Sequence, residues 1–89
     1  MKKILEAILG EPGANIIYPL IKQEDYLTLY TAILNCCSNG LTSGARLSKQ
    51  QEIIIINGLI KRMKEVAPHE NAAIEFIRCG LEYVLEKRN

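Results

Sequence analysis

The chain has 89 residues, of which 48% are hydrophobic and 24% are charged, and its formal net charge at pH 7 is +1. A chain of this length holds one hydrophobic core, and its composition is that of a folded protein and not of a disordered one. A charge so close to zero gives no general attraction for nucleic acid or for an anionic membrane surface, so we expect a small soluble protein for which nucleic acid is an unlikely partner and which binds no membrane.

The cysteines indicate a reducing compartment. Cys36, Cys37 and Cys79 are an odd number with one adjacent pair, which is neither a disulfide framework nor the ligand spacing of a zinc site. His69 is the single histidine and has no partner at a useful spacing. We therefore expect a cytoplasmic protein with reduced thiols, no metal and no cofactor.

The first quarter of the chain predicts two short helices separated by a break. Residues 2–9 carry apolar side chains at a spacing that gives a two-turn helix one buried edge. The segment 10–13, GEPG, interrupts it, because proline lacks an amide proton and glycine permits positive φ. A second helix is expected over residues 16–22, with Asn15 as its cap and Pro19 in its first turn.

A third helix is predicted over residues 25–38. Glu24 and Asp25 place negative charge at its start, where the helix dipole favours it, and Asp25 can act as the cap. Residues 38–40, SNG, end it, since glycine adopts the left-handed cap conformation readily. Apolar positions at helical spacing define its core face: Tyr26, Leu29, Tyr30, Ile33 and Cys37. The uncharged stretch of residues 26–45 is too polar to be a membrane span.

The strongest element is a helix over residues 49–66. Ser48 and Gln51 have the spacing of a capping box, in which each side chain bonds the backbone of the other residue. Four successive isoleucines would ordinarily favour a buried strand, but the cap and the length of the periodic pattern favour a helix. Its expected core face is formed by Ile53, Ile56, Ile60 and Met63 and widened by Ile55, Leu59 and Val66.

Three residues lie on the opposite face of that helix and form a candidate partner site. Ile54 falls there beside Gly58 and Lys61, where a solvated helix would carry only polar residues. Gly58 costs up to about 1 kcal/mol of helix stability relative to alanine, and the close approach of another backbone would account for it.

The last helix is expected over residues 69–87, after Pro68. Its core stripe is Ile74, Ile77, Leu81, Val84 and Leu85, and Glu75, Arg78 and Glu82 form a solvated, ion-paired face. A second apolar stripe, Phe76, Cys79 and Tyr83, widens the apolar arc to about 240°. This helix is therefore either covered on two sides within the bundle or in contact with a partner.

Charge suggests how the last two helices pair. Residues 46–64 carry five basic and one acidic side chain, giving +4, and residues 65–86 carry five acidic and one basic, giving −4. The sequence thus predicts an all-α, small single-domain bundle of four to five helices, in which the last two form an antiparallel hairpin.

No catalytic motif or phosphate-binding loop is present, so we expect no enzyme and no small-molecule substrate. The favoured hypothesis is a protein-interaction module, such as an adaptor, chaperone or inhibitor, that binds a protein partner or forms a homodimer. The residues proposed to bind the partner are Ile54, Gly58, Lys61, Phe76, Cys79 and Tyr83. The opposing interpretation is that these residues are ordinary core.

The alternative function is that of a helix-turn-helix-like DNA-binding regulator. Arg46 and Lys49 would contact phosphate, and Gln50 or Gln51 would read adenine. The connection after residue 40 is longer than the usual turn of that motif, and the isoleucine run is expected to point inward. Nucleic acid is therefore an unlikely partner.

Overall fold

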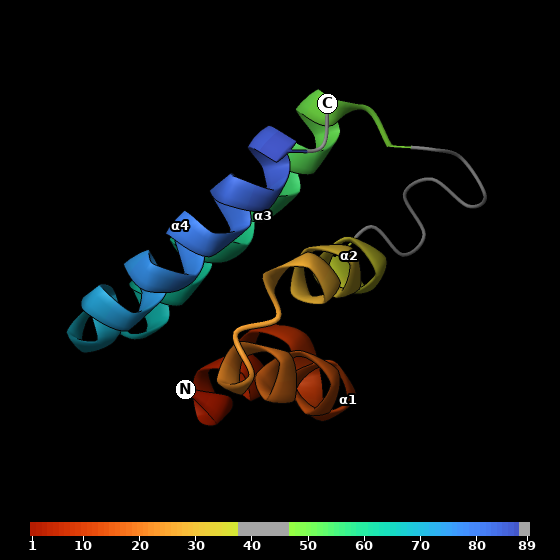
Figure 1. The fold of residues 1–89 in the computed structure, drawn as a ribbon. Coiled ribbons are helices and arrows are strands. Elements are labelled where there is room, and N and C mark those ends of the chain that lie inside the picture. Colours follow the sequence, from red (N-terminus) through yellow and green to blue (C-terminus); the bar gives the residue numbers. More distant parts are fainter. Residues whose placement is uncertain (38–46, 88–89) are drawn as a thin grey trace.

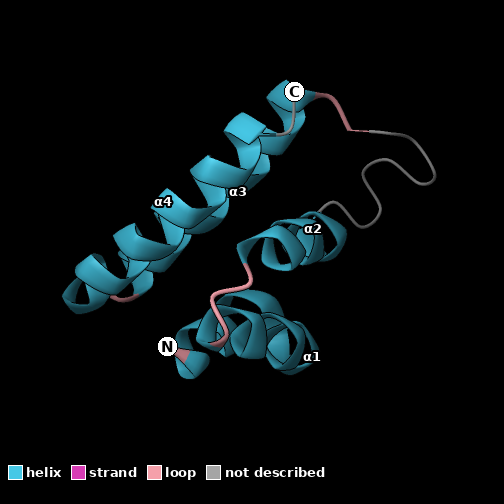
Figure 2. Cartoon of the chain, viewed as in Figure 1, coloured by secondary structure: helices cyan, strands magenta, loops and turns pink. Residues whose placement is uncertain are grey.

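The computed structural model describes residues 1–37 and 47–87, and in these ranges the chain is all-α, with no strand. The elements are α1 (Lys2–Lys22), α2 (Tyr26–Cys37), α3 (Lys49–Val66), the short 3-10 helix η1 (Pro68–Glu70) and α4 (Asn71–Lys87). Figure 2 shows how little of the described chain lies outside these helices. The prediction of a small all-α domain is confirmed. The predicted stop at residues 38–40 lies outside the described ranges.

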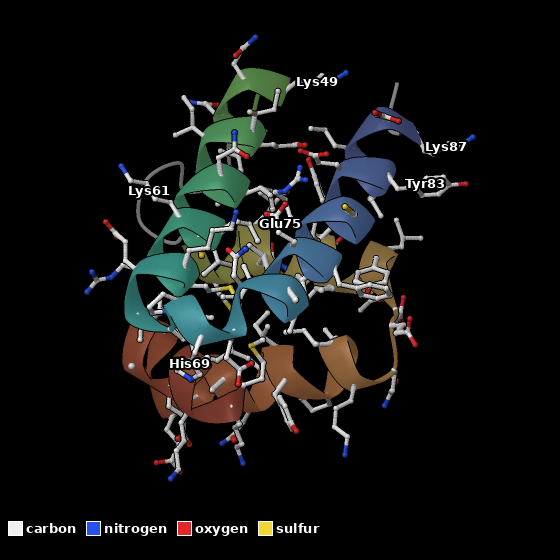
Figure 3. The ribbon with its side chains drawn as sticks, turned by 90° about the vertical axis from the view of Figure 1, so that its left-hand side faces the viewer. Lys49, Lys61, His69, Glu75, Tyr83 and Lys87 are labelled. Carbon is white, nitrogen blue, oxygen red and sulfur yellow. The ribbon has the colours of Figure 1, made fainter. Side chains whose placement is uncertain are left out.

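The helices form two layers. Figures 1 and 3 show α3 and α4 lying side by side, with α1 and α2 packed against one side of that pair. The core fills the space between the layers, and every α-helix contributes to it. Burial of each large aliphatic side chain stabilises the fold by roughly 1.5–3 kcal/mol. The large side chains that are fully buried are Leu5, Ile17, Leu29, Tyr30, Ile33, Met63, Ile74 and Leu81.

The break predicted in the first quarter of the chain is present at Gly10, where α1 is kinked between two helical segments. Gly10 adopts φ 80° and ψ 169°, and helical conformation resumes on its far side. Because the helix begins again directly after Gly10, Pro12 lies in the first turn of the new segment. A backbone amide in that turn would have no partner within the helix, so the missing amide proton of proline costs little. The predicted cap at Asn15 is therefore wrong, and Pro19 lies in the helix interior and not in a first turn.

By length and composition alone, α1 could also cross a membrane. Core helices of soluble proteins pass the same test. In this structure Leu5, Ala14 and Ile17 are fully buried against the rest of the bundle, which is how α1 contributes to the core.

Local signals place the starts of α2 and α3 as expected. The Thr28 amide donates to Asp25 Oδ1 at 3.3 Å, so Asp25 caps α2. The capping box of α3 is complete: the Gln51 amide donates to Ser48 Oγ at 3.2 Å, and the Ser48 amide donates to Gln51 Oε1 at 2.9 Å.

The core faces of α3 and α4 follow the predicted stripes, with two corrections at their ends. In α3 the buried apolar residues are Ile56, Leu59, Ile60 and Met63. Val66 was expected in the core but is 40% exposed, because it is the last residue of the helix. The helix predicted from residue 69 opens with the 3-10 turn η1, and α4 proper begins at Asn71.

Candidate interaction surfaces

The outer face of α3 is open to solvent. Ile54 is 68% exposed, and Gly58 and Lys61 are also exposed. A Cβ added at Gly58 would meet nothing within 4 Å, so no other part of the described chain makes the close approach that could explain this glycine. We call this surface, formed by Ile54, Gly58 and Lys61, the α3 edge. The interpretation of Ile54 as ordinary core is wrong.

The outer face of α4 carries two large exposed rings. Phe76 is 61% exposed and Tyr83 is 62% exposed, and Cys79 lies exposed between them. The Lys87 ammonium lies 5.4 Å from the centroid of the Tyr83 ring, a cation–π distance. We call the surface of Phe76, Cys79 and Tyr83 the α4 edge.

The two edges do not form one site. In Figure 3, Lys61 and Tyr83 point away from each other on opposite sides of the α3 and α4 layer. Glu75 lies between them on the face turned toward the viewer. The six residues proposed from sequence to bind a partner therefore lie on two separate surfaces, one on each helix.

An ion-pair network occupies the face between the edges. Lys64 of α3 contacts Glu75 of α4, and Arg78 donates to both carboxylate oxygens of Glu75, at 3.0 Å each. Arg78 also pairs with Glu82. The hydrogen bonds from Arg78 and then Lys64 lower the pKa of Glu75 to about 2. These contacts tie α3 to α4 and leave the face nearly neutral.

The aromatic ring of Tyr26, from α2, packs against α4 next to the α4 edge. The Tyr26 ring lies against Gly80, where an added Cβ would fall 2.6 Å from ring atoms. The same ring meets Phe76 at a centroid distance of 6.4 Å and an interplanar angle of 55°. Burial, and then the carboxylate of Glu24, raise the pKa of Tyr26. Gly80 is thus required by close packing, and Phe76 contacts the Tyr26 ring on one side.

A groove of about 550 Å³ lies beside the α4 edge, between the amino-terminal half of α4, the end of α1 and the turn before α2. Its walls are mainly apolar and include Tyr18, Ile21, Tyr26, Ala72, Ala73 and Phe76. The charged residues that line it are Lys22, Glu24 and Glu70, of which Lys22 lies 5.9 Å from the centroid of the Tyr18 ring. The sequence did not predict this groove, because its walls come from four separate helices, α1, α2, η1 and α4, and from the turn between α1 and α2. Leu27, at the start of α2, is also exposed, at 67%.

One polar pair is buried in the core. The Tyr30 hydroxyl donates to Glu52 Oε1 at 2.6 Å, and these residues are 1% and 4% exposed. From the sequence Glu52 had no identifiable partner, because Tyr30 is 22 residues away in the chain. The pair joins α2 to α3. Within the described ranges, no group of three or more His, Cys, Asp and Glu residues is placed to hold a metal ion.

The residues proposed for DNA binding lie at the start of α3. Lys49, Gln50 and Gln51 are exposed. In Figure 3, Lys49 lies at the same end of the α3 and α4 layer as Lys87. Gln51 Oε1 already accepts the Ser48 amide in the capping box. Arg46 lies outside the described ranges.

Comparisons of the chain with protein-family models, with curated proteins and with solved structures found no match.

Proposed function

We propose that this protein is a small non-enzymatic interaction module of the cytoplasm, an adaptor, chaperone or inhibitor, that binds a protein partner or a second copy through exposed helix edges. The observation that carries the proposal is the exposure of Phe76 and Tyr83 on one edge and of Ile54 on the other, at 61%, 62% and 68%. Large apolar residues gathered on a surface beside a groove are typical of a binding site, whereas scattered ones are not.

In this proposal the two edges are carried by an antiparallel hairpin made of α3 and α4. Figure 3 supports it by placing Lys49 and Lys87 at one end of the layer and His69 at the other. The contact between Lys64 and Glu75 joins the two helices along the hairpin. Such a hairpin would present the two edges on opposite sides, so two partners could bind it at once.

An enzymatic role has less support. Glu52 is the carboxylate most removed from solvent, and it is engaged by Tyr30 in the core. Among the residues that the structure describes, the apolar groove is lined by Glu24 and Glu70 but by no cysteine, serine or histidine that could act as a nucleophile or base.

DNA binding is the second candidate, favoured by the exposure of Lys49 and Gln50 in the first turn of α3. A mobility-shift assay with mixed-sequence duplex at low salt tests it, because even non-specific phosphate contacts should appear there. Binding that Lys49→Glu removes would favour this candidate. An absence of binding at low salt would exclude it.

The interaction proposal is tested by charge insertion at each edge. Tyr83→Glu and Ile54→Glu should each remove binding at its own edge and leave helicity unchanged, with binding measured by solution mass and by recovery of a partner from the native host. Ile16→Glu is the matched control, since Ile16 is 53% exposed on α1, outside both edges. Loss of helicity in the edge variants would contradict the proposal, because it would show that these residues stabilise the fold.

A further inference from the structure

We draw no further inference here: the strongest candidate, the apolar groove beside the α4 edge that Tyr18, Tyr26 and Phe76 line, carries nothing because its lining mixes Lys22 with Glu24 and Glu70 and nothing in the structure shows what covers it.

Discussion

The two edges of the α3 and α4 layer expose similar apolar side chains but differ in what surrounds them. The α3 edge has Ile54 beside a glycine with open space around it, whereas at the α4 edge Phe76 contacts the Tyr26 ring and borders a groove. Exposed area is therefore a weak guide to a binding surface. The aromatic contact and the groove distinguish the α4 edge, because a concave site buries more of a partner's surface than an open face does.

The largest expected effect on stability comes from the buried pair of Tyr30 and Glu52, which joins α2 to α3. Tyr30→Phe removes the hydroxyl that donates to Glu52 Oε1 and leaves a buried carboxylate with one hydrogen bond fewer. We expect a loss of about 1.5–3 kcal/mol in the free energy of unfolding, as for hydrogen bonds to charged groups. Urea denaturation measures it. An unchanged midpoint and slope of the denaturation curve would mean that this hydrogen bond contributes nothing to the free energy of unfolding.

Gly58 and Gly80 allow the two edges to be compared by the same substitution, glycine to alanine. Gly80→Ala places a Cβ 2.6 Å from the Tyr26 ring, and we expect a loss of about 1–2 kcal/mol and weaker binding at the α4 edge. Gly58→Ala meets nothing within 4 Å and should raise stability by up to about 1 kcal/mol through helix propensity alone. Thermal unfolding of both variants checks this. Equal effects would contradict the distinction between the edges.

Lowering the pH should weaken the ion pair between Lys64 and Glu75, which links α3 to α4. The pKa of Glu75 is lowered to about 2 from the model-peptide value of 4.5. Its ion pairs with Arg78 and Lys64 therefore stabilise the fold above pH 4.5, and this contribution is lost as the pH falls toward 2. Glu75→Gln should flatten that part of the pH–stability curve. Because the Glu75 side chain is half-buried, with 35% of it exposed to solvent, the effect should shrink in high salt, and a salt-independent loss would argue against it.

The smallest expected effect concerns the thiols. Cys79 is exposed, whereas Cys36 and Cys37 are half-buried, and burial and then Cys36 raise the pKa of Cys37. An alkylating reagent in limiting amount should therefore modify Cys79 first, which peptide mass spectrometry reads directly. Equal rates in the native protein, as expected after denaturation, would contradict the exposure of the α4 edge.

Local signals in the sequence were enough to predict most of the fold. The capping box at Ser48 and the apolar stripes of α3 and α4 depend on neighbours within a few residues, so periodicity and caps were sufficient. The break in α1 was predicted correctly at Gly10, but helical conformation resumes directly after it and not at residue 16, because a single positive φ at Gly10 accommodates Pro12. The exposure of Ile54 followed from its place on the helical wheel.

Contacts between distant segments could not be predicted in the same way. The bond between Tyr30 and Glu52 spans 22 residues, and the packing of Tyr26 on Gly80 spans more than fifty. The groove requires α1 and α4 to be placed relative to each other, which no local pattern specifies. For the same reason, local patterns could not predict that the two edges face opposite ways.

Sedimentation equilibrium of three proteins, the wild-type chain, Tyr83→Glu and the control Ile16→Glu, tests the central claim most directly. If the partner of the α4 edge is a second copy, the wild type and Ile16→Glu will have a mass above the 10.0 kDa of one chain, and Tyr83→Glu will remain at 10.0 kDa with unchanged helicity. Three monomers, or an equal loss of mass in both variants, would contradict the binding of a second copy through the α4 edge.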